Sequence, residues 1–183
     1  MVLKIILLVM LSYGLGSITG AYYVTRWMIG KDIRQLGSGN AGARNAGRQT
    51  GRKGFIYTTL IDVAKVFAAL SITTIFFPQN DSLLLVCALF LLLGHIWPVQ
   101  LGFQGGKGVV VFLASTLFLV PLAIPILGIC VGLSYLFVRN FTIAGLISML
   151  AIPITAWVLG ETDYAIGLFT LLIIVVISHI MRK

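Results

Sequence analysis

Two short glycine-rich segments hold most of the side chains in this sequence that suit chemistry on a phosphate group. The first, residues 37–53, contains five glycines, four cationic residues and no acid. Glycine lets backbone N–H groups approach a ligand closely, and successive N–H groups form a nest for an oxyanion. Arginine adds bidentate pairing to phosphate oxygens. The candidate phosphate ligands here are Gly37, Ser38, Gly39, Asn40, Arg44, Asn45 and Arg48. This composition fits two interpretations: a phosphate-binding loop, or a flexible connector whose cations only follow membrane topology.

The second segment, residues 102–108, is shorter and carries a single cation, Lys107, after Gly105 and Gly106. A lysine in this setting can place a point charge on a phosphate. The alternative is a lysine that snorkels to the membrane interface, but the flanking glycines favour phosphate binding. Just before this segment lies His95, which with His179 completes the histidines of the chain. Either could act as a general base, although a structural hydrogen bond near a helix end is the simpler interpretation of His95.

The rest of the chain must position these segments within a membrane. Of 183 residues, 59% are hydrophobic and only 10% are charged, and the mean hydropathy is +1.06, whereas a soluble domain carries about 25% charged residues. We therefore expect one all-α integral membrane domain over residues 1–183, whose first apolar segment is a retained helix and not a signal peptide. The net charge of +8 fits anionic lipid headgroups better than nucleic acid. Cys87 and Cys130 lie in apolar runs, so we expect no disulfide, metal site or cofactor.

Seven membrane-spanning helices are predicted. Their approximate bounds are 3–26, 54–77, 82–101, 108–120, 122–138, 141–159 and 164–180. The apolar run 109–138 is 30 residues long, more than the roughly 20 that one span needs, and Pro121 and Pro125 divide it. In the first helix, Gly16 and Gly20 stand four residues apart, a spacing that allows close helix packing in lipid.

The distribution of charge predicts the orientation. With seven spans and the N-terminus outside, 11 of the 13 lysines and arginines fall on the cytoplasmic side, as the positive-inside rule requires. These are Arg26, Lys31, Arg34, Arg44, Arg48, Arg52, Lys53, Lys107, Arg139, Arg182 and Lys183. Both glycine-rich segments then share the cytoplasmic face, where converging polar groups make a plausible site for an anionic, partly lipidic ligand.

One charged pair lies inside a predicted span. Asp62 and Lys65 are three residues apart and therefore share a helix face. Charges within a membrane helix are costly and usually face the bundle interior. The pair either neutralises itself or supports the first polar loop from below.

Both glycine-rich segments resemble the signatures of a known family. Residues 37–45, with Arg48 and Gly51 after them, are similar to the first signature of the bacterial acyl-phosphate:glycerol-3-phosphate acyltransferases. Residues 94–98, continuing through 103–109, are similar to the second. The small residues at 16–20, the Asp62–Lys65 pair and the seven-span plan also fit, so the resemblance covers essentially the whole chain.

The resemblance implies transfer of a fatty acyl group from an acyl-phosphate to the sn-1 hydroxyl of glycerol 3-phosphate, giving lysophosphatidic acid and phosphate. It implies a phosphate cradle containing Ser38 and Arg48, with Lys107 neutralising phosphate and Thr142 matching a hydroxyl residue at the start of the sixth helix. His179 matches the first residue of the last signature. We expect direct transfer without an acyl-enzyme, at the cytoplasmic face of a bacterial inner membrane, near membrane lipids and the enzyme that makes the acyl-phosphate.

Three positions depart from the family pattern. Arg44 stands where the family usually has threonine, and Gln104 stands where lysine is common. Arg182 occupies the place of an asparagine in the last signature, one residue before the sequence ends at Lys183, which puts the C-terminal part of the glycerol-phosphate site in question. The alternative function is that of a divergent paralogue that binds lipid phosphate without catalysis or acylates another acceptor.

Overall fold

The computed structural model describes residues 1–181, and every regular element in that range is helical. The α-helices are α1 (Val2–Ser17), α2 (Gly20–Ile29), α3 (Ala43–Phe76), α4 (Asp81–Ile96), α5 (Val109–Leu119), α6 (Ala123–Val138), α7 (Phe141–Ser148), α8 (Ala151–Val158) and α9 (Thr162–Met181). Two single 3₁₀ turns, η1 (Ile33–Gln35) and η2 (Val99–Leu101), lie in the connections that carry the glycine-rich segments. Arg182 and Lys183, including the predicted departure at Arg182, lie outside the described residues.

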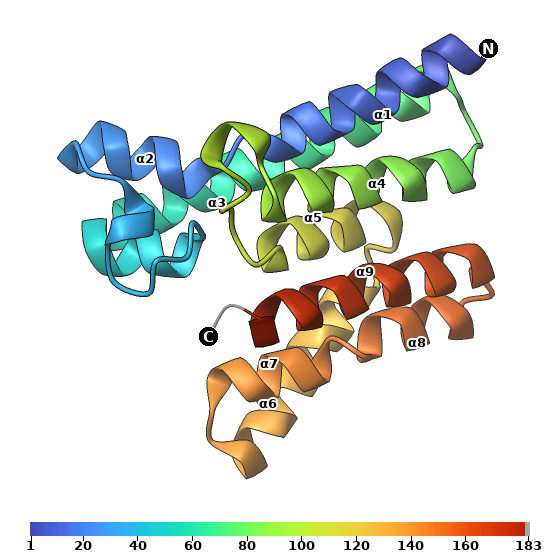
Figure 1. Ribbon diagram of the computed structural model, residues 1–183. Coiled ribbons are helices and arrows are strands. Elements are labelled where there is room, and N and C mark those ends of the chain that lie inside the picture. The colour runs from blue at the N-terminus through green and yellow to red at the C-terminus, as the bar shows by residue number, and fades with distance from the viewer. Residues whose placement is uncertain (182–183) are drawn as a thin grey trace.

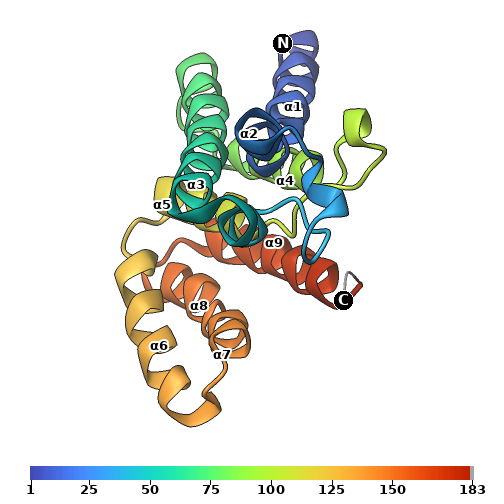
Figure 2. The ribbon, with the colours of Figure 1, turned by 90° about the vertical axis from the view of Figure 1, so that its left-hand side faces the viewer.

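Helix α4 is the centre of the packing. It lies along α1 and also contacts α3, α5 and α9, and its buried residues, such as Leu91 and Leu92, belong to the main apolar core. Helices α6, α7 and α8 form a second group, which joins the rest where α8 packs on α9 (Figure 1). Viewed at right angles, α9 lies between this group and the bundle of α1 to α5 (Figure 2).

Five stretches among the described residues are long and apolar enough to cross a membrane: Val2–Ile29, Ala43–Phe76, Asp81–Leu101, Phe141–Val158 and Thr162–Met181. The chain is an integral membrane protein with an all-helical fold. The division of the 109–138 run at Pro121 is confirmed, because α5 ends at Leu119 and α6 begins at Ala123. These two helices, of 11 and 16 residues, are each shorter than the roughly 20 residues of an ordinary span.

The first span is interrupted, where a continuous helix over 3–26 was predicted. Ile18 and Thr19 are extended, with ψ of 96° and 101°, and α2 starts anew at Gly20. The predicted close packing of the small residues is confirmed: a Cβ on Gly16 would overlap the carbonyl oxygen of Leu91, and one on Gly20 would lie 2.8 Å from that of Thr58. Backbones therefore approach closely on both sides of the break.

The first polar segment is shorter than predicted. A loop over 28–53 was expected, but α3 already begins at Ala43, so Arg44, Asn45 and Arg48 stand on a helix. Gly51, with φ 75° and ψ −170°, kinks this helix before it continues to Phe76. Only glycine adopts such a conformation readily, so the glycine that suggested a loop instead redirects a helix.

Two other helix boundaries differ from the predicted ones for reasons of proline chemistry. The third predicted helix, 82–101, ends at Ile96, two residues before Pro98, because the residue before a proline disfavours the helical region. The predicted helix 141–159 is divided at Met149 and Leu150. Pro153 has no N–H to offer the carbonyl of Met149 four residues earlier.

Candidate phosphate-binding site

The tip of the first loop is held by one buried amide. Asn45, 2% exposed, donates through Nδ2 to the carbonyl oxygens of Leu36 at 2.9 Å and Asn40 at 3.1 Å. Its Oδ1 accepts from the backbone N–H of Ser38 at 3.2 Å. Gly37 has a positive φ of 56°, and a Cβ there would lie 2.5 Å from Asn45 Oδ1. Asn45 thus fixes the loop from beneath. This geometry does not support the direct contact with phosphate predicted for it.

The exposed polar groups of this loop surround the place where its backbone turns. Ser38 and Gly39 are exposed, and Gly39 has a φ of 70°. Asn40 is half-buried, and its Oδ1 is buried without a hydrogen-bond partner among residues 1–181. A buried acceptor without a donor is costly. The Oδ1 atom of Asn40 is therefore an acceptor that the loop itself does not satisfy.

An ion pair that was not identified from the sequence joins the two glycine-rich connections. Arg34 Nη2 contacts Asp32 Oδ2 at 2.6 Å, and Nη1 donates to the carbonyl of Leu101 at 2.6 Å. The hydrogen bonds from Arg34 hold the pKa of the Asp32 carboxyl below its usual value, and the same bonds raise the pKa of the guanidinium. The Arg34 guanidinium also lies 5.5 Å from the ring centre of Tyr22. The Asp-x-Arg spacing at 32–34 was the sequence feature that could have revealed the ion pair. It does not reveal the bond from Arg34 to Leu101, which is 67 residues away.

The second loop folds back on the end of α4. Gly105 N donates to Ile96 O at 3.1 Å, and Gly106 N donates to His95 O at 3.0 Å. Both glycines are buried. A Cβ on Gly106 would overlap the His95 imidazole and lie 3.0 Å from the carbonyl oxygen of Ala41. The two glycine-rich segments therefore pack directly against each other, and half-buried Lys107 follows the point where they meet.

Beneath this contact lies a buried network centred on Lys65. Its ammonium group donates to Asp62 Oδ1 at 2.7 Å, to the carbonyl oxygens of Ile18 at 2.7 Å and Gly16 at 3.0 Å, and lies 2.9 Å from His95 Nδ1. The ammonium group has three N–H donors for these four neighbours, so at least one donor is shared. Nδ1 of His95 accepts from it in the tautomer that carries the ring proton on Nε2. That nitrogen faces Gly106.

Both interpretations of the Asp62–Lys65 pair describe part of this network. The two side chains neutralise each other, as the simpler interpretation requires. Lys65 also reaches the break between α1 and α2 and, through His95, the loop that carries Lys107. For His95, the expected structural hydrogen bond near a helix end is present. The three residues predicted as supporting groups thus form one connected cluster under the site.

The far side of the site comes from α7 and α9. Arg44 Nη1 donates to Thr142 Oγ1 at 2.6 Å, across 98 residues of sequence. His179, near the end of α9, lies within electrostatic range of Lys107 and Arg44. Its Nδ1 is buried, and the backbone of Val175, one helical turn earlier, lies within hydrogen-bonding range of the ring. The structure thus brings Arg44, Thr142, His179 and Lys107 to one region, although they come from four separate helices or loops.

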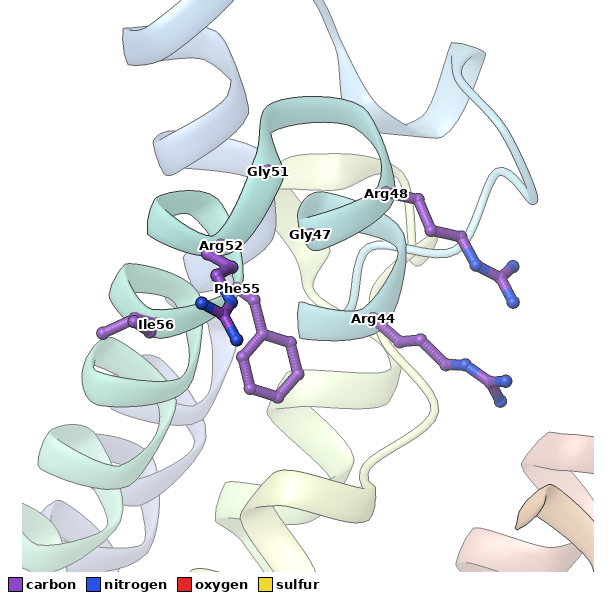
Figure 3. Close-up of a pocket in the computed structure, with 7 residues that line it drawn as sticks. All are labelled: Arg44, Gly47, Arg48, Gly51, Arg52, Phe55 and Ile56. Carbon is purple, nitrogen blue, oxygen red and sulfur yellow. The ribbon is translucent and has the colours of Figure 1, made fainter.

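Arg48 lies one helical turn after Arg44 and borders an open hollow of about 480 Å³. Arg52 contributes a third guanidinium, while Phe55 and Ile56 make an apolar wall. In Figure 3, Arg44 and Arg48 extend from one side of the helix, and Arg52 lies beside Phe55. Arg52, Phe55 and Ile56 were not among the predicted site residues.

A model of the family described as glycerol-3-phosphate acyltransferase matches residues 6–182. The glycerol-3-phosphate acyltransferase 1 of Dehalococcoides mccartyi is 33% identical over 172 residues, covering 91% of this chain and 83% of its own. That of Bacillus thuringiensis subsp. konkukian is 34% identical over 175 residues, covering 94% and 93%.

Two crystal structures of the integral membrane glycerol 3-phosphate acyltransferase PlsY share the fold. Its glycerol 3-phosphate form has a TM-score of 0.87 at 27% identity, covering 97% of this chain and 89% of that one. Its lysophosphatidic acid form has a TM-score of 0.85 at 25% identity, covering 96% and 88%. The family match spans nearly every residue, including both glycine-rich loops and the helices that bring them together, so this chain belongs to the glycerol-3-phosphate acyltransferase family.

Proposed function

We propose that this protein transfers a fatty acyl group from an acyl-phosphate to the sn-1 hydroxyl of glycerol 3-phosphate, releasing lysophosphatidic acid and inorganic phosphate. The observation that carries the proposal is the contact between the two glycine-rich loops at Ala41 and Gly106. It brings the loop that carries Ser38 against the loop that carries Lys107, and Arg44 and Arg48 follow the first loop on α3. Two substrates that both carry phosphate require such a concentration of donors and cations.

The reaction requires the protein mainly to position the two substrates and to supply positive charge to the leaving phosphate. An acyl-phosphate is a mixed anhydride and already activated. The glycerol hydroxyl oxygen attacks the acyl carbon, the carbon–oxygen bond to phosphate breaks, and phosphate leaves with the bonding electrons. Lys107 neutralises the leaving phosphate, and the loop backbone with Ser38 orients the phosphate groups. His179, which lies near Lys107 and Arg44, takes the hydroxyl proton as the general base.

The second substrate, glycerol 3-phosphate, is held by the other polar groups of the site. Asn40 Oδ1, a buried acceptor without a donor among residues 1–181, suits a glycerol hydroxyl. Arg44 and Thr142, whose side chains are joined by a hydrogen bond of 2.6 Å, suit the phosphate of glycerol 3-phosphate, because a guanidinium and a hydroxyl can bind neighbouring oxygens of one phosphate. No acyl-enzyme forms, so the acyl group passes directly between the two substrates.

In the membrane, the chain crosses seven times, with its N-terminus outside and the site at the cytoplasmic face of a bacterial inner membrane. Helices α5 and α6 provide the two short spans beyond the five long ones. The positive-inside distribution of lysine and arginine supports this orientation. The acyl-phosphate then arrives from the bilayer, where the enzyme that makes it is the expected partner, and glycerol 3-phosphate arrives from the cytoplasm.

The test is a direct assay of the purified full chain with acyl-phosphate and glycerol 3-phosphate, following phosphate release and lysophosphatidate formation together. Equal amounts of the two products are expected. An active family member under the same conditions is the control, and no product beside an active control would refute the activity. Phosphate release that depends on another hydroxyl acceptor would support the alternative, which Arg44 favours by adding a cation where the family usually has threonine.

A further inference from the structure

The hollow beside the kink of α3 has the features of a lipid-headgroup site. Its cations, Arg44, Arg48 and Arg52, stand at four-residue intervals, and no acid is among the residues that line it. The φ of 75° at Gly51 turns the chain between Arg48 and Arg52, so guanidinium groups border the hollow on both sides of the kink. Such a site has a strong preference for an anion.

The same hollow also has an apolar wall. Phe55 is 47% exposed and Ile56 is 50% exposed, and both line the same hollow. A small soluble anion gains nothing from an apolar wall. A phospholipid, in contrast, places its phosphate on the arginines and its glycerol and first methylene groups on Phe55 and Ile56.

The depth of the hollow in the membrane supports the same conclusion. Helix α3 has 34 residues and is therefore about 51 Å long at 1.5 Å per residue if straight, whereas the hydrocarbon core is about 30 Å thick. Its N-terminal turns, up to the kink, must lie at the interface. Trp27 and Tyr57, whose rings are 5.9 Å apart, lie next to this region, and such aromatic pairs are typical of the headgroup level.

We propose that this hollow binds an anionic phospholipid of the surrounding bilayer, with Arg52 as the residue that distinguishes this lipid site from the reaction site. Arg44 and Arg48 border both, whereas Arg52, Phe55 and Ile56 belong only to the hollow. The bound lipid neutralises the arginines on the bilayer side of α3 and anchors the kink that carries Arg48. Lipid binding at this hollow does not require catalysis, so it can be tested independently of the proposed reaction.

The test is lipid retention by the full chain reconstituted in nanodiscs of phosphatidylglycerol and phosphatidylcholine, extracted in mild detergent and weighed by native mass spectrometry. Arg52→Gln is compared with Lys53→Gln, which removes the same charge from the adjacent exposed residue outside the hollow. We expect the native chain and Lys53→Gln to retain phosphatidylglycerol preferentially. Arg52→Gln should reduce that preference about tenfold, the effect of losing one charge-assisted contact.

Two results would overturn the proposal. An equal loss in Arg52→Gln and Lys53→Gln would mean that the basic surface attracts anionic lipid without a site. An unchanged preference for phosphatidylglycerol in Arg52→Gln would mean that the hollow does not hold the lipid. Unfolding temperatures of both variants in lipid-free detergent, expected to match that of the native chain because both side chains are exposed, show whether a loss of lipid has a folding cause.

Discussion

Replacing Lys65 by methionine tests whether the buried charge network holds the site together. Asp62 and Lys65 are 1% and 5% exposed. Without the lysine, the Asp62 carboxylate stays buried with its cationic partner removed. Breaking one partner of a buried ion pair costs about 3–5 kcal/mol. For a chain of this size, 1 kcal/mol shifts the unfolding temperature by about 2–4 °C, so Lys65→Met should lower it by roughly 6–20 °C.

A second variant separates the charge from the hydrogen bonds. In Asp62→Asn with Lys65→Met, no buried charge is left unpaired, so the penalty for the isolated carboxylate disappears. The carbonyl groups of Gly16 and Ile18 still lose their donor, at about 1–3 kcal/mol each. The double variant should therefore recover part of the loss of Lys65→Met and remain below the native chain.

The assay is thermal unfolding of the purified variants in one mild detergent, followed by intrinsic tryptophan fluorescence. Phospholipid is kept at a fixed ratio, because bound lipid raises the unfolding temperature by mass action. A single variant that unfolds at the native temperature would refute the reasoning. Equal unfolding temperatures for the single and double variants would show that the unpaired charge is not what destabilises the protein.

Four further predictions concern the loops. Lys107→Ala should lower kcat by at least about a hundredfold, the usual effect of removing a charge that stabilises a leaving group; steady-state phosphate release measures it, and an unchanged kcat rules out that role. Asn45→Ala removes the bonds that fix the first loop and should raise the KM for glycerol 3-phosphate by about tenfold, with saturation kinetics as the measurement. Arg44→Thr removes a cation proposed to bind the phosphate of glycerol 3-phosphate, so the KM for glycerol 3-phosphate should rise, and an unchanged KM would contradict that role. Arg34 lowers the pKa of Asp32, so the pair stabilises the fold above the ordinary carboxyl pKa near 4 and loses this effect as the pH falls through the lowered value; unfolding temperatures between pH 6 and pH 3 should fall less steeply for Asp32→Asn.

The sequence predicted the site as a set of residue types better than as a geometry. The two glycine-rich segments were identifiable because they are the polar exceptions in an apolar chain, and charge placement put them on one face. The contact between Gly106 and Ala41 needs the fold itself. The role of Asn45 could not be predicted because its partners are backbone carbonyls. Every residue has a backbone carbonyl, so the sequence does not indicate which ones a side chain will bind.

The break at Ile18 and Thr19 shows the same limit. Neither residue is a proline or glycine, and the apolar run continues through them, so a continuous span was expected there. Lys65 compensates for the break, although it lies 47 residues after Ile18. Its ammonium group neutralises Asp62 and donates to the carbonyl oxygens of Gly16 and Ile18, which have no helical partner at the break. The charged pair was visible in the sequence, but its target was not.

Glycine-rich loops bring backbone close to a phosphate, but they are flexible, and a flexible loop loses binding free energy when it orders around its ligand. In this protein each loop is ordered in advance by side chains from elsewhere. Asn45 fixes the first loop, Arg34 joins the two connections, and His95 supports the second loop while Lys65 supports His95. Except for the half-buried Arg34, these supports are polar and buried, so each is costly unless every partner is present. Loss of any one should therefore impair substrate binding before it unfolds the helices, except at Lys65, where the same group also holds the first span together.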